Sequence, residues 1–551
     1  MKSAPEGTSS TPPTSRLGAM LEILWIVLLI LPAATTASVT RIFDSNEDAL
    51  FIVSCWLVVG ARLLFAGRAF FPVTLPFAVM GVACMLADFL RGADLLALLL
   101  QWRTFSPLEV AGAARPYAWI IAGGCAALAA LCWACWRTAR PVRQVRWVRP
   151  GVLAVTLALA FALPGTTWLR AWPVDAVLMV ATSATRSGVM AQYLFPASST
   201  VNPRDPSSHW RSARRTQAPA DETMVLVIGE TIRNDYLKEC NGPDRVRAVA
   251  PGALVACDMT SGSDGTDLSV PLLVSREMPG HRVRVSDDAT FLNALAHGGF
   301  ETWWISAQAP SIAWPDAQHQ LFPVQRGLDS AVLLPPLTQA LDSTARLKAV
   351  VLHANNAHDP YCARYDPARA PYPSHCLASG EAASVRNIAA LRLNYANAVD
   401  ASIGFVNAVI AELDKRPQPA FLVFTPDHGE NLLDDARSIW GHARRHPTRW
   451  DTHVPAIFWA NAAWRNTHAG EWSLLQSSIH LPLMQIDMVP TLLDAAGIGY
   501  EDMRPARTDL LRLQPGARER VVQLSLDATI TWDALVEEAR AAGPLAPAPA
   551  R

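Results

Sequence analysis

Five long apolar runs follow one another in the first third of the chain. They cover Leu21–Val39, Ala49–Ala66, Phe71–Leu90, Tyr117–Trp136 and Gly151–Trp172. A helix needs roughly 20 mostly apolar residues to cross a bilayer, and each run meets or approaches that length. Buried helices of a soluble protein are the alternative, but five such runs in one stretch are hard to bury otherwise. The sequence therefore predicts a bundle of five transmembrane helices over residues 19–173.

Basic residues in the short connections predict the orientation, because cytoplasmic loops carry an excess of them. The residues that favour a cytoplasmic start are Lys2, Arg16, Arg62, Arg68 and the five arginines of 137–150. Arginines in the fourth connection disagree with this orientation. A cleaved signal peptide at the first run is a further alternative. Whether the first run is a membrane helix or a signal peptide, the protein is predicted to cross the membrane several times, and everything after Trp172 is predicted to lie outside the cytoplasm.

The remaining segments differ in composition. Residues 1–18 are rich in Ser, Thr and Pro and are predicted to be a disordered cytoplasmic tail. Residues 174–222 are interpreted as an interfacial helix, over 174–195, followed by a polar linker. A soluble catalytic domain is predicted over 223–535, and a mobile tail over 536–551. The net charge of −1 gives no electrostatic reason to expect a nucleic-acid partner.

Four cysteines lie in the soluble part: Cys240, Cys257, Cys362 and Cys376. An even number in an extracytoplasmic compartment favours disulfides. The sequence-local pairing joins Cys240 to Cys257 and Cys362 to Cys376, although four cysteines allow three pairings. Zinc binding by these four is the alternative, but no CxxC spacing supports it.

The soluble part alternates strand and helix patterns, which indicates an α/β fold with a largely parallel sheet. Three continuous apolar runs are predicted as buried strands: MVLVIGE at 224–230, AVVLHAN at 349–355 and AFLVFTPDHGE at 420–430. A long helical pattern covers 383–415. Each strand ends in a carboxylate, an imidazole or both. In such sheets ligands bind beyond the carboxyl ends of the strands.

If these strands are neighbours, Glu230, His353, Asp427 and His428 converge at one edge of the sheet. Carboxylates with imidazole suit a zinc site. Each group alone has a structural explanation, such as a helix cap for Glu230. Two potential ligands on adjacent residues need a turn to face one metal, and Gly429 allows that turn.

Four short motifs stand at or near the predicted strand ends and a glycine-containing loop: GETIR at 229–233, TDLSVP at 266–271, HANNAHDP at 353–360 and TPDHGE at 425–430. They resemble those of the phosphoethanolamine transferases of Gram-negative inner membranes, the lipid A-modifying group that includes the mobile colistin-resistance enzymes. The resemblance covers residues 20–525. It implies five membrane helices followed by a periplasmic domain of the alkaline phosphatase/sulfatase fold, attached to the bacterial inner membrane.

The resemblance also implies roles for individual residues. Thr266 falls at the nucleophile position, and Glu230, Asp427 and His428 fall at metal positions, with Thr266 completing the metal shell. His353 and His358 are implied as phosphate-site or second-metal residues, and His442 as a further histidine of the site. The implied cofactor is zinc, one ion or two. Arg233 and Glu430 are interpreted as supporting or surface ion-pair residues.

The sequence departs from the family around the nucleophile and the phosphate site. Gly262 and Leu272 stand where relatives have cysteines, and no lysine occurs within 303–314. Asp264 and Asp267 are not expected to bind zinc and are assigned to the acceptor side or to loop shape. Ser269 and Pro271 spell most of a sulfatase formylglycine motif, but Leu273 replaces its arginine. These departures leave the acceptor open.

The resemblance implies transfer of phosphoethanolamine from phosphatidylethanolamine to lipopolysaccharide (lipid A or core) or another envelope glycan, through a covalent phospho-threonine. A threonine hydroxyl is a weak nucleophile, which a bound zinc ion activates. Imidazoles neutralise charge on the transferred phosphate and serve as acid or base. Phosphoglycerol transfer and sulfatase-like hydrolysis are the alternatives.

Overall fold

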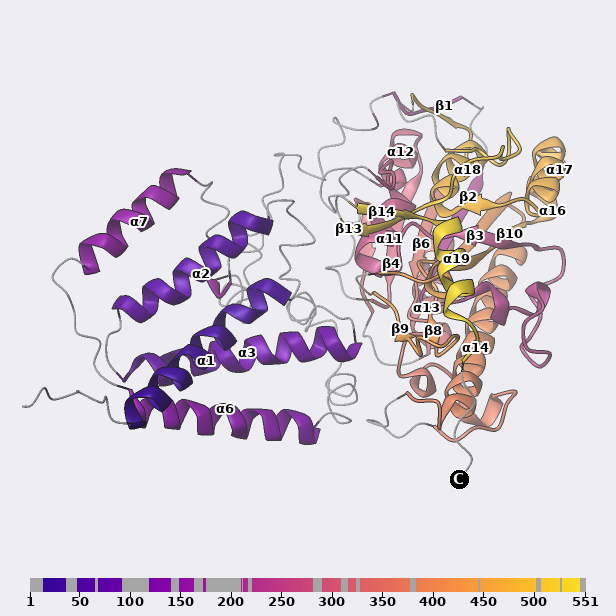
Figure 1. Cartoon of the computed structure of the whole chain (residues 1–551). Helices are drawn as coiled ribbons and strands as arrows, with labels where there is room; N and C mark the ends of the chain where they lie inside the picture. Colours follow the sequence, from indigo (N-terminus) through magenta and orange to yellow (C-terminus); the bar gives the residue numbers. More distant parts are fainter. Residues whose placement is uncertain are drawn as a thin grey trace, which may run out of the picture. The chain divides into compact units, whose positions relative to one another are not determined.

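The computed structural model divides the chain into two compact units (Figure 1). The first comprises residues 1–102 and 117–196, and the second residues 103–116 and 197–551. The structure describes residues 13–35, 47–64, 68–91, 118–139, 148–162, 172–174, 210, 212–216, 221–280, 290–308, 316–323, 328–376, 383–443, 446–501, 507–525 and 528–545. Apolar helices make up the described part of the first unit, and an α/β domain makes up that of the second.

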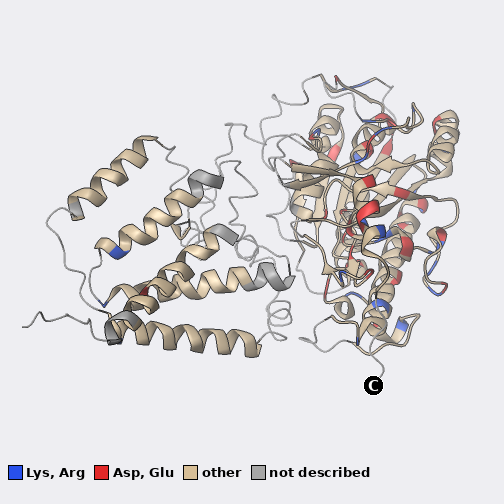
Figure 2. Cartoon of the chain, viewed as in Figure 1, with Lys and Arg blue, Asp and Glu red and all other residues tan. Residues whose placement is uncertain are grey.

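Helices form at all five predicted apolar segments. They are α1 (Pro13–Thr35), α2 (Glu47–Leu64), α3 (Phe70–Arg91), α6 (Ala118–Thr138) and α7 (Val148–Ala162). Few charges lie on the described parts of these helices, in contrast to the second unit (Figure 2). Of the described helices in this unit, α6 alone is long and apolar enough to cross a membrane by length and composition; the apolar parts of the others are shorter. The five crossings therefore stay a prediction.

Side chains from α1, α2, α3 and α6 fill the centre of this helical unit. Trp25 of α1 is fully buried, and its indole N–H donates to Thr74 Oγ1 of α3 at 2.9 Å. Its ring also meets the edge of Phe71 at 6.2 Å. Arg62 of α2 pairs with Glu22 of α1 at 2.7 Å. Polar groups inside this apolar bundle are thus hydrogen-bonded to one another, as a low-dielectric interior requires.

The N-terminal boundaries differ from the predicted ones. Helix α1 begins at Pro13, inside the predicted tail of 1–18, because proline fits the first turn of a helix. The predicted linker contains strand β1 (Arg214–Arg215), which pairs antiparallel with β12 (Ile498–Gly499). Trp210 just before it is buried against Tyr500. This part of the linker therefore belongs to the second unit. The predicted interfacial helix lies outside the described residues, apart from Val174.

The predicted mobile tail is wrong over its first residues. Helix α19 runs from Trp532 to Ala542, past the predicted boundary at residue 536. Leu535 and Ala539 lie one turn apart on one face and are buried, and the Thr531 hydroxyl accepts the N–H of Ala534 at the helix start. Burial of this face extends the domain beyond the predicted boundary.

An eight-stranded sheet forms the centre of the second unit, in the order β11-β3-β10-β7-β2-β6-β4-β5. Its strands are β2 (Glu222–Gly229), β3 (Leu254–Thr260), β4 (Glu301–Ser306), β5 (His319–Leu321), β6 (Leu347–His353), β7 (Ala420–Pro426), β10 (His453–Ala460) and β11 (Leu483–Met484). Strand β10 runs antiparallel to both neighbours, and the other pairs are parallel. The largely parallel α/β sheet is thus confirmed, with β10 as its exception.

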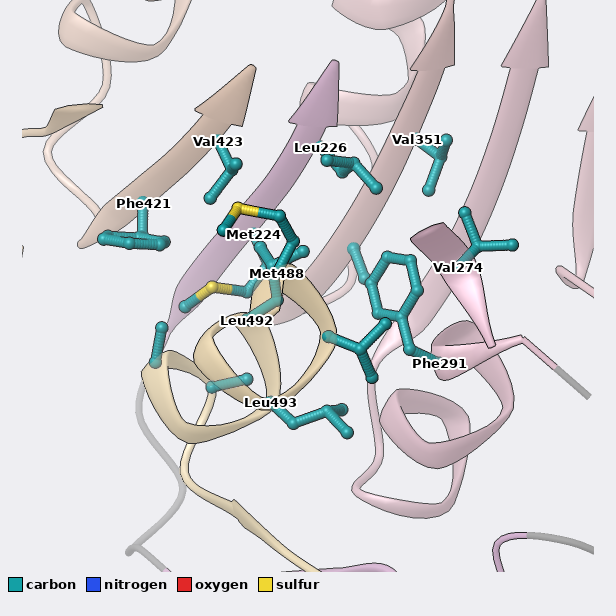
Figure 3. Packing of buried hydrophobic residues seen from close by; sticks show 14 of the residues in the cluster. Met224, Leu226, Val274, Phe291, Val351, Phe421, Val423, Met488, Leu492 and Leu493 are labelled. Carbon is teal, nitrogen blue, oxygen red and sulfur yellow. The ribbon is translucent and has the colours of Figure 1, made fainter. Parts of the chain in front are cut away.

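Helices cover both faces of the sheet. The principal ones are α11 (Thr266–Val274), α12 (Phe291–His297), α13 (Asp329–Leu341), α14 (Ile388–Asp414) and α18 (Met488–Ala495). In β2, Met224 and Leu226 join one buried cluster, while Val225 and Val227 join the other. Figure 3 shows Met488 and other α18 side chains packed on the first face. A strand buried on both faces explains the continuous apolar run in the sequence.

Short elements connect and border this sheet. They are the 3₁₀ helices η3 (Asn234–Tyr236), η4 (Lys238–Cys240), η5 (Tyr361–Ala363), η6 (Pro367–Arg369) and η7 (Gln485–Asp487), the helices α15 (Arg449–Thr452), α16 (Ala462–Thr467) and α17 (Ala469–Ser478), and the strands β8 (Asn431–Leu432), β9 (Trp440–Gly441), β13 (Val521–Ser525) and β14 (Ala528–Thr531).

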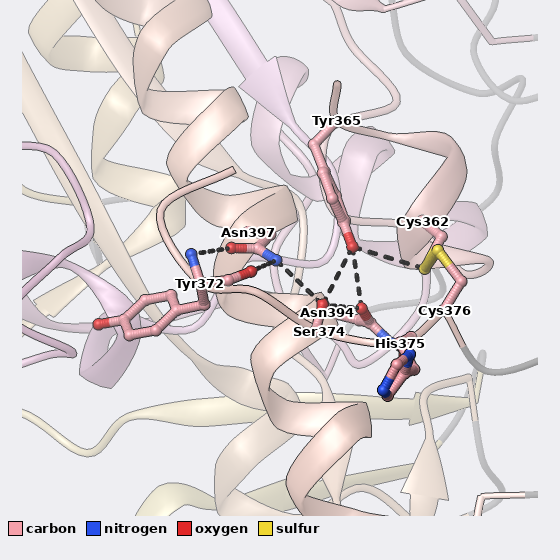
Figure 4. The surroundings of a disulfide bond; sticks show 8 residues. All are labelled: Cys362, Tyr365, Tyr372, Ser374, His375, Cys376, Asn394 and Asn397. Atoms are coloured by element: carbon pink, nitrogen blue, oxygen red, sulfur yellow. Dashed lines mark hydrogen bonds between the residues drawn. A yellow bond between two sulfur atoms is a disulfide. The ribbon is translucent and has the colours of Figure 1, made fainter. Parts of the chain in front are cut away.

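Two disulfides join the four cysteines of this unit. Cys240 bonds to Cys257, and Cys362 bonds to Cys376, which is the sequence-local pairing. Around the second disulfide, the Tyr365 hydroxyl donates to Asn394 of α14 at 2.8 Å (Figure 4). With their sulfurs bonded in pairs, these cysteines are not arranged as zinc ligands.

Candidate active site

The three predicted strands are neighbours, in the order β7-β2-β6. Their register places Ile228 opposite both His353 and Thr425, so the strands end at the same level. Glu230 follows β2 directly, His353 is the last residue of β6, and Asp427 follows β7. The predicted convergence of these groups at one edge is confirmed. Parallel order alone accounts for it, because strands of equal register present their carboxyl ends together.

The Glu230 carboxylate is buried and held by two donors. Thr231 Oγ1 donates to Glu230 Oε1 at 2.5 Å, and Gln308 Nε2 donates to Oε2 at 2.6 Å. Thr231 has a φ of +60°, which is unfavourable for a β-branched residue. Such a conformation costs about 1–3 kcal/mol and persists where the surrounding structure fixes it, often at functional sites. Here it turns both the hydroxyl and the backbone N–H of Thr231 toward the site.

Asp427 and His428 are oriented by backbone groups. Asp427 Oδ1 accepts the N–H of His428 at 2.8 Å and that of Thr231 at 3.3 Å, so Oδ2 faces the site. The Nδ1–H of His428 donates to the Gly429 carbonyl at 2.8 Å, which leaves Nε2 facing the carboxylates of Glu230 and Asp427. A Cβ on Gly429 would lie 2.2 Å from the carbonyl oxygen of Trp450. Close approach of another backbone, rather than an unusual φ, therefore requires this glycine.

The Thr266 hydroxyl lies at the centre of these groups. Its Oγ1 is 2.7 Å from Asp427 Oδ2 and 3.3 Å from both Glu230 Oε2 and His428 Nε2. Thr266 is the first residue of α11, and Gly265 occupies the N-cap position. The hydroxyl is therefore directed at the strand-end groups and does not cap its own helix. Ser269, three residues on, is fully buried within α11.

The three predicted substrate histidines surround this centre. His442 lies next to His428, with ring centroids 4.3 Å apart, and next to His358 at 5.4 Å. The Nδ1–H of His358 donates to the Asp359 carbonyl at 2.6 Å. His353 is buried on the Glu230 side, and its Nε2 has no hydrogen-bond partner among the described residues. An unpartnered buried imidazole nitrogen of this kind suits a ligand or metal.

The carboxylates and imidazoles of the site perturb one another. Burial raises the pKa of Asp427 to about 7, and the negative charge of Glu230 adds to this shift. Burial also disfavours the charged form of Glu230, but contact with His428 outweighs it and holds the pKa of Glu230 well below its usual range. Burial lowers the pKa of His353 to about 4, so this imidazole is neutral.

The donor set fits a zinc ion. In each of two residue groups, every residue offers one ligand atom, and these atoms lie within 4.8 Å of one another. The groups are Glu230 with His428 and His442, and Glu230 with His353 and Asp427. In the described part of the chain, neither Glu230 nor Asp427 accepts a hydrogen bond from a lysine or arginine. Buried carboxylates without a lysine or arginine partner, next to imidazole nitrogens, are the ligands zinc prefers.

The remaining predicted residues lie around this centre. Arg233 is buried between Asp235 and Asp434, as an ion-pair residue. Glu430 is also buried rather than on the surface; it accepts the Tyr361 hydroxyl at 3.0 Å and contacts His442 Nδ1 at 3.2 Å. The backbone oxygen of Asp264 accepts the N–H of Ala443, and this residue is in neither metal-ligand group. The side chain of Asp267 lies outside the described part.

The sequence reasoning missed Gln308, Thr231 and Gln485. Gln308 stands two residues after β4, so the strand-end rule could have found it, but the search in this segment was for a lysine. The motif GETIR contained Thr231 without indicating its role. Gln485 carries no local signal, because its partners are far away in the sequence.

A family model for sulfatases matches residues 222–498, just over half of the chain. The match runs from the first residue of β2 into β12, and it contains the strand ends and Thr266. The chain belongs to the sulfatase family. The geometry above is thus that of a sulfatase-family domain whose central hydroxyl is a threonine.

Solved structures share the fold of this sulfatase-family chain. The C-terminal periplasmic domain of EcEptC from Escherichia coli, in complex with zinc, has a TM-score of 0.52 at 19% identity, covering 60% of this chain and 97% of that one. Lipooligosaccharide phosphoethanolamine transferase A (EptA) from Neisseria meningitidis, an integral membrane protein, has a TM-score of 0.57 at 16% identity, covering 88% and 95%. At these identities the likeness establishes the fold.

The sequence is also similar to the Escherichia coli K12 protein YhbX. The two are 27% identical over 252 residues, which is 43% of this chain and 43% of YhbX. The match thus spans less than half of the curated relative's length.

Proposed function

We propose that this sulfatase-family chain is a membrane-attached phosphoethanolamine transferase. It moves phosphoethanolamine from phosphatidylethanolamine to lipopolysaccharide or another envelope glycan, through a phospho-threonine at Thr266. One observation carries the proposal: the Thr266 hydroxyl meets Asp427, Glu230 and His428 within 3.3 Å at the carboxyl edge of the sheet. The motif resemblance and the fold shared with EptA and EcEptC support the donor.

The Thr266 hydroxyl donates its hydrogen bond to Asp427 Oδ2, which prepares it for attack. The oxygen of Thr266 forms a bond to the phosphorus of phosphatidylethanolamine, and the bond from phosphorus to the diacylglycerol oxygen breaks. The proton of Thr266 passes to Asp427, and the diacylglycerol oxygen takes up a proton from one of the site histidines as it leaves. Phosphoethanolamine is then esterified to Thr266.

An acceptor oxygen completes the transfer. It forms a bond to phosphorus while the acceptor's proton passes to one of the site histidines, the bond from phosphorus to Thr266 breaks, and Thr266 regains the proton held by Asp427. We assign His353, His358 and His442 to the transferred phosphate: the neutral His353 imidazole as a hydrogen-bonding group, and His358 and His442 as proton-transferring groups. The N-terminus of α11 directs its free N–H groups and its dipole toward the same phosphate.

Glu230, Asp427 and His428 would hold a zinc ion beside Thr266, with His358 and His442 available for a second. When bound, zinc supplies positive charge that lowers the pKa of a coordinated hydroxyl. Buried carboxylates that accept from no lysine or arginine in the described chain support this assignment.

We further propose five membrane crossings and a catalytic domain on the periplasmic side of a bacterial inner membrane. Attachment keeps the domain near lipid headgroups, which raises the effective concentration of the donor. The five apolar helices α1, α2, α3, α6 and α7 support this arrangement.

Mass spectrometry of lipid extracts and lipopolysaccharide, from cells with and without the chain, tests the proposal. We expect an envelope glycan to gain one phosphoethanolamine unit, and the gain to be lost in Thr266→Ala. A gain of glycerol phosphate instead identifies a phosphoglycerol transferase. Donor cleavage with no modified glycan identifies a hydrolase. Either result contradicts the proposal.

A further inference from the structure

Two buried glutamines hold the loop that precedes the nucleophile, residues 261–265, here called the nucleophile loop. The N–H of Gly262 donates to Gln485 Oε1 at 3.2 Å. The carbonyl of Gly262 accepts the N–H of Gln523 at 2.8 Å, and Ser263 Oγ donates to the Gln523 carbonyl at 2.8 Å. Both glutamines lie more than 200 residues further along the chain. The loop is therefore fixed by the C-terminal part of the domain.

The Gln485 side chain also reaches the turn that carries Asp427, a proposed metal ligand. Its Nε2 donates to the Pro426 carbonyl at 2.5 Å and to the Asp427 carbonyl at 3.2 Å. Gln485 is 1% exposed. A single buried amide thus joins the loop that leads into Thr266 to the turn that carries Asp427.

The sheet explains why Gln485 lies there. Strand β11 pairs in parallel with β3, and its last residue, Met484, lies opposite Thr260, the last residue of β3. The residues that follow the two strands, Gln485 and the nucleophile loop, therefore leave the sheet side by side. Because Gln485 is buried, its side-chain amide, rather than water, forms hydrogen bonds with the backbone groups around it.

Packing completes the support of the loop. A Cβ on Gly262 would lie 2.8 Å from Leu272 Cδ1 and 3.0 Å from Leu272 Cβ. These are the two positions where the resembling enzymes carry a pair of cysteines. In this chain a leucine fills the space against a glycine, and the tie between the loop and α11 is a non-covalent one.

We propose that Gln485 is a positioning residue for the nucleophile: it sets the place of Thr266 relative to Asp427 by binding both segments through one amide. The inference rests on the proposed function, since the reaction supplies its kinetic readout. Removing the amide leaves an N–H and two carbonyls without this partner, and a buried polar group without a partner is unfavourable. A displacement of about 1 Å at a reacting group lowers rates by up to about a hundredfold.

The test compares Gln485→Met, which keeps the length but loses the hydrogen bonds, with Gln514→Met. Gln514 is a surface glutamine whose amide donates to Ser477. In full-length protein with phosphatidylethanolamine vesicles, we expect Gln485→Met to lower kcat by about tenfold to a hundredfold. The KM for the donor stays unchanged, because Gln485 does not line the donor site in this account. Gln514→Met leaves both constants at the wild-type value.

A rescue experiment separates positioning from general stability. Gly262→Cys with Leu272→Cys installs a disulfide between the loop and α11, at positions whose Cβ atoms are close enough for one after a small shift. We expect this pair to recover at least part of the kcat lost in Gln485→Met, measured well below the melting temperature. A variant that lost only stability regains its melting temperature but shows no change in kcat per folded molecule.

Hydrogen exchange gives a readout that needs no substrate. We expect the amides of the nucleophile loop to exchange faster in Gln485→Met and at the wild-type rate in Gln514→Met. Unchanged exchange, a kcat within twofold of wild type, or a rise in KM alone overturns the inference. A wild-type protein that exchanges as expected but transfers no phosphoethanolamine overturns the proposed function and leaves the positioning of the loop supported.

Discussion

Buried charged side chains have different kinds of partner at the two ends of the central strands. At the amino ends, Glu222 accepts from Arg215 at 2.7 Å, and the Lys348 ammonium donates to the Leu341 carbonyl at 2.7 Å. At the carboxyl ends, Glu230 and Asp427 are both fully buried, and no lysine or arginine of the described chain donates to them. The buried acid at the amino edge is therefore paired with an arginine, whereas the two at the carboxyl edge have only imidazole as a basic partner in the described chain.

This difference distinguishes charged groups that stabilise the fold from charged groups that would carry the proposed chemistry. Buried charges at the amino edge meet partners of opposite sign or a carbonyl, as stability requires. The carboxyl edge keeps two acids near one hydroxyl and several imidazoles, an arrangement that a bound cation would stabilise. Variants at the two edges are therefore expected to fail in different ways.

The largest effect is expected for Asp427→Asn. Loss of this carboxylate removes the partner of Thr266 at 2.7 Å and a proposed metal ligand. We expect transfer activity to fall by at least about a thousandfold, together with loss of bound zinc. The measurements are the initial rate and the metal content of the purified full-length protein.

Asp221→Asn is the matched control at the amino edge, where Asp221 pairs with exposed Arg346 at 2.6 Å. We expect its activity and zinc content to stay at the wild-type value, because surface pairs contribute little. Equal losses in both variants contradict a special role for the carboxyl edge.

The next effect concerns the disulfide beside the carboxyl edge. Cys362 and Cys376 enclose the segment that follows η5, whose Tyr361 hydroxyl donates to Glu430. Replacing both cysteines by alanine is expected to lower the free energy of unfolding by about 2–4 kcal/mol. Denaturant titration of the oxidised protein and the variant measures it. An unchanged unfolding midpoint shows that this edge needs no covalent support.

Gln308→Met tests how a proposed metal ligand at the carboxyl edge is held in place. The Gln308 amide donates to Glu230 Oε2 at 2.6 Å and to the Ala354 carbonyl at 3.0 Å, so it orients a proposed metal ligand. Loss of such a supporting group typically lowers metal affinity by about tenfold to a hundredfold. Competition with a zinc chelator measures the affinity. Gln320→Met, on β5, serves as the control, and an equal change in both variants argues against this role.

The last prediction is a pH dependence of stability at the amino edge. Burial raises the pKa of Glu222 to about 7, although Arg215 opposes the shift. The folded state therefore binds more protons than the unfolded state between the ordinary carboxyl pKa and about 7. Stability from this group is present at low pH and is lost as pH rises through that window, by at most about 1.4 kcal/mol per pH unit.

Glu222→Gln is expected to remove this part of the pH dependence. Thermal melts of both proteins between about pH 5 and pH 7 measure it, since the shifted carboxyl titrates there. The same slope in both proteins shows that Glu222 does not titrate in this window.

The sequence allowed the central part of this site to be predicted. Strands β2, β6 and β7 are continuous apolar runs that end in polar residues, and parallel order brings such ends together. Thr266 was identified by motif resemblance, which depends on short local patterns. The roles of these residues stay predictions, although the structure brings the residues together.

The remaining features could not be predicted from the sequence because they depend on long-range contacts. Gln485 and Gln523 act through partners more than 200 residues away, which no local pattern indicates. Strand β1 in the predicted linker and the C-terminal half of α19 form because they dock on the domain. Gly429 was expected for its conformational freedom, whereas the structure requires it for the approach of the Trp450 carbonyl.

The central claim is a covalent phosphoethanolamine on Thr266, and intact-mass spectrometry tests it most directly. Full-length protein is incubated with phosphatidylethanolamine vesicles without acceptor and is then mapped by peptide. The account predicts a gain of one phosphoethanolamine group on the peptide that contains Thr266, and no gain in Thr266→Ala. An adduct on another residue, or release of diacylglycerol with no adduct on the protein, would contradict it.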